Sequence, residues 1–179
     1  MAAAFDITEL VTALRAAAAG ENAAKAVRAL LEETMADPAR VAAGMPDYPE
    51  NDIIFHEDEA VSIWHCRFMP GTTVPAHDHK MSAVIGVYAG RERNDFFQSD
   101  GKGGLQRSSA TEVSPGDVLS IGPSAIHSVS CISDTPCCGI HVYLGNLTDT
   151  ERSLFNPDTG EALAFTMDNY EKLQRPDQG

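Results

Sequence analysis

Positive charge is scarce in this sequence. Its 13 lysine and arginine residues stand against 26 aspartate and glutamate residues among 179, which gives a net charge of −13. Nucleic acids and anionic membranes are bound through basic faces, so this balance argues against both as partners. No apolar run approaches the roughly 20 residues that span a bilayer. Residues 1–6 lack the basic and apolar regions of a signal peptide. We therefore expect a cytoplasmic protein that binds neither nucleic acid nor membrane.

Cysteine is scarce too, and no two cysteines form a C-x-x-C pair. The four are Cys66, Cys131, Cys137 and Cys138. Since no export signal precedes them, we expect reduced thiols rather than disulfides. Hydrophobic residues make up 43% of the chain, which argues against a disordered protein. The length suits one well-buried domain and is marginal for two.

The first 45 residues have helical patterns. Residues 6–9 form a capping box, with Phe5 and Leu10 placed as its hydrophobic staple, and Gly20 can end the helix. A second helix is predicted over residues 22–35 from apolar residues at helical spacing. Pro38 can begin a short third helix. We expect residues 1–45 to pack as helices on the outside of a second unit, residues 46–179.

The pattern changes to short strands separated by turns from about residue 47. Strands are expected over residues 53–55, 61–68, 73–79, 82–88, 91–98, 105–107, 111–113, 118–121, 126–132 and 137–143. Many short strands at near-regular spacing predict an all-β sandwich or barrel. After Asn146 we expect a loop, then a last helix over residues 167–173 and a frayed tail over residues 175–179.

Three histidines form the candidate metal site. His77 and His79 lie two residues apart on an expected strand, so their side chains point to the same face. His127 follows a turn at residues 114–117 in a similar setting. Any one of them alone would be read as an ordinary core or surface histidine. Together they predict one metal site, for which imidazole nitrogens suit iron, zinc, copper or nickel.

The glycines around these histidines carry a resemblance to a known family. Gly71, then the histidine pair, then Gly90 eleven residues further on resembles the first cupin motif, and Gly116 with His127 resembles the second. The resemblance implies a double-stranded β-helix (cupin) barrel with an N-terminal helical segment. Most cupins add a glutamate ligand, yet residues 80–90 contain no Glu or Asp. In this the chain resembles the thiol dioxygenases, cysteine dioxygenase and 3-mercaptopropionate dioxygenase, which bind Fe(II) through three histidines.

A second match lies at residues 139–143. The thiol dioxygenases carry a Ser-x-His-x-Tyr strand near the iron, and this chain has His141 and Tyr143 with Gly139 in place of the serine. The resemblance implies a non-haem Fe(II) dioxygenase that adds both atoms of O2 to the sulfur of a small thiol. Tyr143 would donate a hydrogen bond to bound oxygen or substrate, and His141 would orient it. Zinc or nickel could replace iron in the isolated protein, and the expected state is a monomer or homodimer.

Two positions depart from the family pattern. Ala83 stands where mammalian-type enzymes have a cysteine cross-linked to the tyrosine, so Tyr143 should be unmodified. Asn51 and Asp52 stand where the family has an arginine for the substrate carboxylate. Free L-cysteine is therefore expected to be a poor substrate. A thiol without a carboxylate near the sulfur, or one whose acid is bound by a different arginine such as Arg67, should be a better one. Arg91 and Arg93 are the other candidates for this arginine.

Two other functions fit a three-histidine cupin. One is an oxygenase that cleaves a carbon–carbon bond of a diketone-like substrate. The other is a non-catalytic sensor that binds a metal or ligand. The pair His141 and Tyr143 favours the thiol dioxygenase, and the lack of a helix-turn-helix or basic patch weakens the sensor.

Overall fold

The computed structural model describes residues 4–174. The predicted frayed end at residues 175–179 lies outside them. Four helices occur in the described part: α1 (Ile7–Ala18), α2 (Ala23–Met35), α3 (Pro38–Gly44) and α4 (Met167–Leu173). Asp6 caps α1, since its carboxylate accepts from the backbone N–H of Thr8 at 2.7 Å. None of these helices combines the length and apolar character needed to cross a bilayer.

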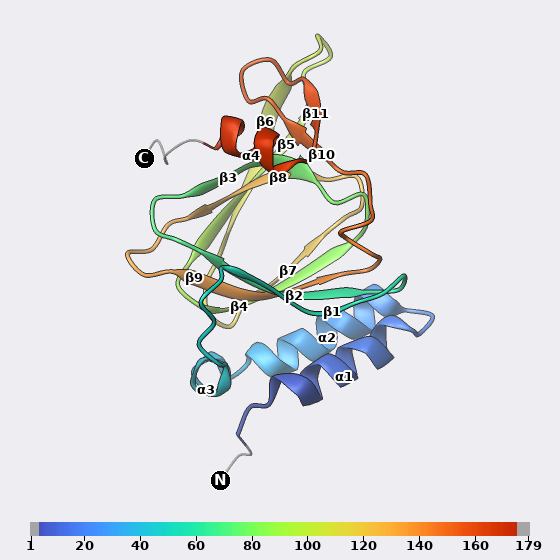
Figure 1. Ribbon diagram of the computed structural model, residues 1–179, viewed down its shortest axis with the longest axis vertical. Helices are drawn as coiled ribbons and strands as arrows, with labels where there is room; N and C mark the ends of the chain where they lie inside the picture. Colours follow the sequence, from blue (N-terminus) through green and yellow to red (C-terminus); the bar gives the residue numbers. More distant parts are fainter. Residues whose placement is uncertain (1–3, 175–179) are drawn as a thin grey trace.

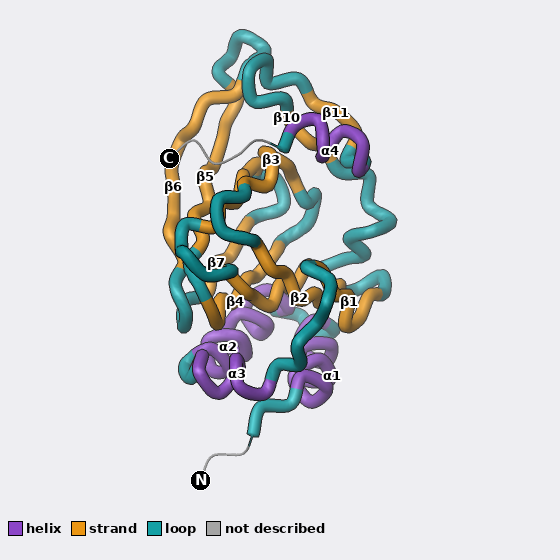
Figure 2. Tube along the Cα trace, turned by 60° about the vertical axis from the view of Figure 1, so that its left-hand side comes forward, coloured by secondary structure: helices purple, strands orange, loops and turns teal. Residues whose placement is uncertain are grey.

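The strands form two antiparallel sheets that face each other (Figures 1 and 2). The five-stranded sheet has the order β1 (Asp52–Glu57), β2 (Ser62–Phe68), β9 (Cys137–Tyr143), β4 (Ala83–Ala89), β7 (Val118–Ile121). The six-stranded sheet has the order β11 (Ala162–Ala164), β10 (Ser153–Phe155), β3 (Thr73–Asp78), β8 (Ile126–Cys131), β5 (Glu92–Ser99), β6 (Leu105–Val113).

The pairing of the strands is that of one long hairpin wound into a barrel. β5 pairs with β6 at its tip, and then β4 pairs with β7, β3 with β8 and β2 with β9. Successive pairs fall alternately in the six-stranded and the five-stranded sheet. This arrangement is a double-stranded β-helix, so the all-β prediction with an N-terminal helical segment is confirmed.

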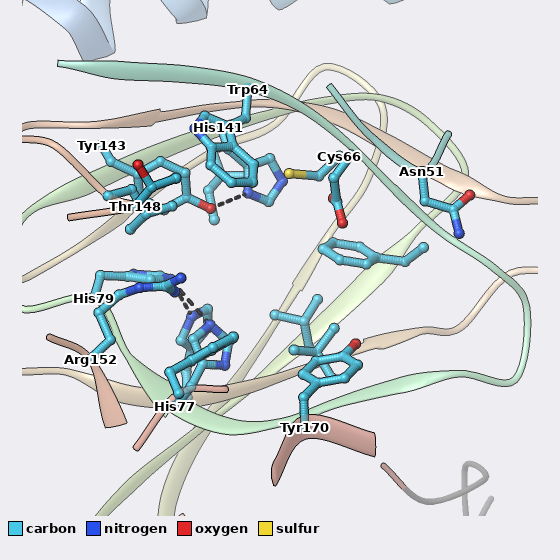
Figure 3. Close-up of a pocket in the computed structure, with 18 of the residues that line it drawn as sticks. Asn51, Trp64, Cys66, His77, His79, His141, Tyr143, Thr148, Arg152 and Tyr170 are labelled. Carbon is cyan, nitrogen blue, oxygen red and sulfur yellow. Dashed lines mark hydrogen bonds between the residues drawn. The ribbon is translucent and has the colours of Figure 1, made fainter. Parts of the chain in front are cut away.

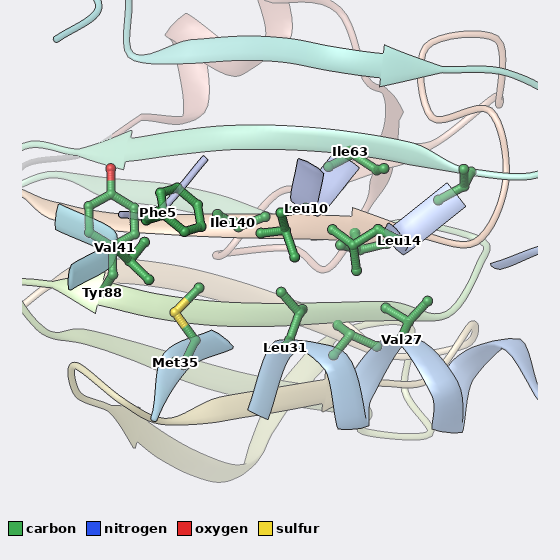
Figure 4. Packing of buried hydrophobic residues seen from close by; sticks show 13 residues of the cluster. Phe5, Leu10, Leu14, Val27, Leu31, Met35, Val41, Ile63, Tyr88 and Ile140 are labelled. Atoms are coloured by element: carbon green, nitrogen blue, oxygen red, sulfur yellow. The ribbon is translucent and has the colours of Figure 1, made fainter. Parts of the chain in front are cut away.

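The helices α1, α2 and α3 cover the outer face of the five-stranded sheet (Figures 1 and 4). Leu14, Leu31 and Met35 of the helices are fully buried against this face. Ile140 of β9 and Tyr88 of β4 belong to the same cluster. The apolar faces of these helices are therefore buried against the sheet as well as against neighbouring helices.

Strand β4 is apolar on both faces because both are covered. Val84 packs under the helices, while Ile85 points to the opposite face and lines the barrel interior. Gly86 lets α2 approach closely, since a Cβ at that position would lie 2.9 Å from Cε of Met35. The five-stranded sheet therefore has the helices packed on its outer face and the cavity on its inner face.

Two strand predictions were wrong. Residues 105–113 form one strand, β6, rather than two short ones, because the exposed segment is held along its length by pairing with β5. Residues 147–166 were expected to be loop, yet they contain β10 and β11. These three-residue strands pair with each other and, through Leu154, with His77 of β3. Each strand is too short for an alternation of hydrophobic and polar residues to be recognised in the sequence.

Replacing Met35 by Ala tests the contact between helix and barrel. The side chain is fully buried, so we expect the free energy of unfolding to fall by about 2–5 kcal/mol. Met167→Ala makes the same chemical change at a residue that is 63% exposed, and it should cost less than about 0.5 kcal/mol. Urea unfolding followed by circular dichroism measures both. Equal losses would contradict the packing described here.

Candidate metal centre

Pairing of β3 with β8 brings the three predicted histidines together inside the barrel. The register places His127 directly opposite His77, and His79 follows β3 on the same face as His77. The Nε2 atoms of His77 and His79 lie 3.1 Å apart, and those of His79 and His127 lie 3.4 Å apart. All three rings are buried.

Hydrogen bonds on the far side of two rings fix where their lone pairs point. Nδ1 of His77 lies 2.8 Å from the carbonyl oxygen of Pro75, and Nδ1 of His127 lies 2.9 Å from Oδ1 of Asn94. Both oxygens are acceptors, so each Nδ1 donates, and each Nε2 presents a lone pair to the common centre. Burial lowers the pKa of His77 to about 4 and holds the pKa of His79 and of His127 well below its usual value. The rings are therefore neutral at pH 7, as metal ligands must be.

The spacing of these nitrogens fits one ion. Nitrogens about 2.1 Å from a metal lie about 3.0 Å apart at right angles and about 3.4 Å apart at tetrahedral angles. The two separations given above, 3.1 and 3.4 Å, are close to these values. Among the described residues, this group of possible ligand atoms contains the three histidines and no carboxylate. The geometry suits a centre with three neutral ligands.

The histidines open onto a cavity of about 590 Å³ between the two sheets (Figure 3). That volume is ordinary for a small-molecule site. Its aromatic walls are formed by Trp64, Phe68, Phe165 and Tyr170. Two charged side chains other than histidine line it, Asp52 and Arg152. A ligand bound in this cavity can therefore contact one cationic and one acidic side chain.

His141 and Tyr143 also line this cavity, on the five-stranded sheet opposite His77 (Figure 3). The Tyr143 hydroxyl lies 3.2 Å from Nδ1 of His141, and its ring centroid lies 5.0 Å from that of His79. Burial raises the pKa of Tyr143 well above its usual value, so the phenol keeps its proton. Ala83 is the cross-strand neighbour of Tyr143. It carries no thiol that a cross-link would require.

Gly139 stands at the position of the expected serine, and its surroundings in the structure differ in two ways from those that a serine would need. Buried Nε2 of His141 has no hydrogen-bond partner among the described residues. A Cβ on Gly139 would lie 3.3 Å from this nitrogen and 3.0 Å from the carbonyl oxygen of Gly86. The backbone of β4 therefore leaves little room for a serine side chain at position 139.

Arg152 is the residue of the cavity that sequence reasoning missed. Its guanidinium carbon lies 4.1 Å from the ring centroid of Phe165, and Figure 3 shows it beside His77 and His79. The next residue, Ser153, donates its backbone N–H to Asp78 at 2.9 Å, which ties the arginine to the histidine segment. Within residues 4–174 no carboxylate forms an ion pair with Arg152. One sequence signal existed, since Arg152 is the only lysine or arginine in residues 108–171.

The arginines considered from the sequence have other partners. Arg67 donates to the backbone carbonyl oxygens of Tyr48, Pro49 and Glu50, so it holds the loop before β1. Arg93 pairs with Asp95 at 3.1 Å. Arg67, Arg91 and Arg93 do not line the cavity. Asn51 and Asp52, which occupy the expected arginine position, do line it.

No known family model matches the chain. Among solved structures, it is similar to the DMSP lyase DddQ from Ruegeria pomeroyi (18% identity, TM-score 0.45), over 56% of this chain and 46% of that one. It is similar to Bacillus subtilis oxalate decarboxylase OxdC (18%, 0.47) over 65% and 31%. An uncharacterised Klebsiella pneumoniae protein with a double-stranded β-helix domain (16%, 0.47) matches over 64% and 92%. The matched region is less than half of the lyase and decarboxylase chains. Similarity this low leaves the activity to be argued from the site.

Replacing His127 by Ala tests the three-histidine site. We expect the wild-type protein to bind about one divalent ion per chain and the variant to lose most of it, because two ligands hold an ion far less well than three. Elemental analysis after dialysis against metal measures this. His56→Ala is the control, since His56 lies on β1 and bonds Asp58 outside the site. Full metal content in His127→Ala would exclude this residue as a ligand.

Proposed function

We propose that this protein is an iron-dependent dioxygenase that oxidises a small thiol bearing a carboxylate to a sulfinate. The reaction adds both atoms of O2 to sulfur, RSH + O2 → RSO2H, so sulfur loses four electrons and dioxygen gains them. The observation that carries the proposal is the pairing, in one cavity, of a neutral three-nitrogen site with an arginine that has no ion-pair partner among the described residues.

The metal and the chain would divide the work. His77, His79 and His127 would hold a divalent iron through neutral nitrogens, and the iron, with its charge unneutralised by the protein ligands, would favour binding of a thiolate. Holding the reactants side by side supplies much of the rate enhancement. Arg152 would take the substrate carboxylate, because a carboxylate buried without a cation is very costly and a guanidinium binds it through two parallel hydrogen bonds.

Tyr143 is the hydrogen-bond donor of the site. It lines the cavity from the sheet opposite His77, and its hydroxyl lies 3.2 Å from Nδ1 of His141. When Nδ1–H of His141 donates to the phenol oxygen, the O–H group is left to donate a hydrogen bond to oxygen or to the substrate as negative charge develops. His141 acts through this contact. Burial lowers its pKa to about 3, so it is a neutral partner at pH 7.

Substrate preference tests the role of Arg152. The iron-loaded protein should oxidise 3-mercaptopropionate with a higher kcat/KM than cysteamine, which has no carboxylate. L-cysteine should remain a poor substrate, because its ammonium group is on the carbon that bears the carboxylate and would lie next to the Arg152 guanidinium. Arg152→Gln should lower kcat/KM for 3-mercaptopropionate about 100-fold and leave the low value for cysteamine nearly unchanged. Oxygen consumption together with sulfinate detection measures both.

The control for that substitution is Arg107→Gln, an exposed arginine that pairs with Asp95. It should keep the wild-type preference. Equal losses for all three thiols in Arg152→Gln would show that this residue supports the fold rather than the carboxylate. Activity on diketones without activity on any thiol would replace the proposed reaction by carbon–carbon cleavage. Metal binding without oxygen consumption would favour the sensor.

Tyr143→Phe separates the hydrogen bond that the hydroxyl donates from the packing of the aromatic ring. The ring is retained and the hydroxyl removed, so metal content should be unchanged while kcat falls about 100-fold. Stopped-flow or oxygen-electrode kinetics at saturating thiol measures kcat. A wild-type kcat in this variant would exclude the hydroxyl from the reaction.

A further inference from the structure

A carboxylate lies buried behind the metal site without a cation. Glu92 of β5 is fully buried, with 0% exposure. Its cross-strand neighbours are Cys131 of β8 and Val113 of β6. Among the described residues no lysine, arginine or histidine forms an ion pair with it. Burial raises the pKa of Glu92, as expected of a carboxyl group in such surroundings.

The carboxylate is connected to His127 by one intervening side chain. The amide Nδ2 of Asn94 donates to Oε1 of Glu92 at 2.9 Å, and Oδ1 of Asn94 accepts from Nδ1 of His127 at 2.9 Å. Asn94 is also fully buried, with 0% exposure. The only other polar contact of Glu92 in the described structure is with the thiol of Cys137, 3.7 Å away. The chain therefore runs from carboxylate to amide to imidazole to the metal position.

Each member of the chain fixes the orientation of the next. A carboxylate accepts hydrogen bonds, so it turns the NH2 group of Asn94 toward itself and the carbonyl oxygen toward the ring. That oxygen holds the proton of His127 on Nδ1, which leaves the Nε2 lone pair at the metal position. The backbone sets the spacing, because Glu92 and Asn94 lie two residues apart on β5 and face inward together.

We propose that Glu92, acting through Asn94 and His127, is the outer carboxylate that offsets the charge of the bound metal. The inference rests on the proposed metal site. Three histidines leave a divalent ion with its whole charge inside the barrel, and the ligand group found among residues 4–174 contains no acid. A carboxylate two hydrogen bonds away makes the imidazole a better electron donor and supplies the opposite charge. Glu92 would supply the negative charge that the glutamate ligand supplies in most cupins.

The position of Glu92 also separates charge from coordination. All of the described ligand atoms at the centre stay neutral, so the positions facing the cavity remain open to an anionic substrate. Glu92 lies beyond His127, on the side away from those positions, since it is reached through Nδ1 rather than Nε2. It is a positioning residue and touches neither thiol nor oxygen in this arrangement.

Glu92→Gln tests this, because it keeps the shape and removes the charge. Titration of metal-free protein with Co²⁺, with a chelator as competitor, should show a 10- to 100-fold weaker Kd than wild type, of the order seen when outer partners of metal ligands are removed. The visible absorption bands of bound Co²⁺ should also shift, because the donor strength of His127 changes. The melting temperature of the metal-free variant should equal or exceed that of wild type, because glutamine avoids the cost of burying an ionisable carboxyl group.

Asp95→Asn is the matched control. It removes the same charge from the next outward-facing position of β5, where Asp95 pairs with Arg93 and Arg107. Its Co²⁺ affinity should remain within threefold of wild type. If Glu92→Gln fails to fold, Asn94→Ala breaks the same chain one step nearer the metal and should show the same loss.

Three results would overturn the inference. One is a Glu92→Gln protein with wild-type Co²⁺ affinity and spectrum. Another is a loss of affinity of equal size in Asp95→Asn. The third is a wild-type protein that binds no Co²⁺, which would remove the metal site as well. Failure of the thiol assay alone would reject the proposed reaction and leave this result standing, since the readouts are affinity and spectrum.

Discussion

Three buried imidazole nitrogens that lie within 4.8 Å of one another are the constraint on which the rest of this structure depends. Two lone pairs that point at one centre repel unless a cation or a proton lies between them, and burial removes the water that would screen them. The barrel accepts this arrangement through the pairing of β3 with β8 and through the acceptors behind His77 and His127. The site is therefore built to be completed by a metal.

Charge inside the barrel is arranged around that centre. Arg152 faces the cavity, Glu92 lies behind the ligand shell, and Asp52 sits on the cavity wall at the start of β1. With neutral ligands, each of these groups acts on the centre or its ligand from outside the coordination shell. Substrate choice and metal affinity can then vary through different side chains.

The fold and the three metal candidates could be predicted because their signals are local. Period-two strands, turn glycines and the spacing of His77 and His79 are visible within a few residues, and His127 stands after its own turn. Arg152 could not be placed, because the short strand that follows it is held only by pairing with β11 and β3, which the sequence does not reveal. Glu92 and Asn94 were missed for another reason. A polar residue on alternate strand positions indicates a solvent-facing side, and only the packed barrel shows that this side is inward.

The nesting of the strand pairs also determines how the entropy cost of loop closure differs from one pair to the next. β5 and β6 are joined by a short turn, whereas Phe68 of β2 meets Cys137 of β9 across most of the barrel sequence. Loop closure becomes more costly in entropy with each outer pair. Helices α1, α2 and α3 precede strands β1 to β9 in the chain, yet their packing surface includes Ile140 of β9. During synthesis these helices must therefore wait for β9 before they can bury their apolar side on the complete sheet.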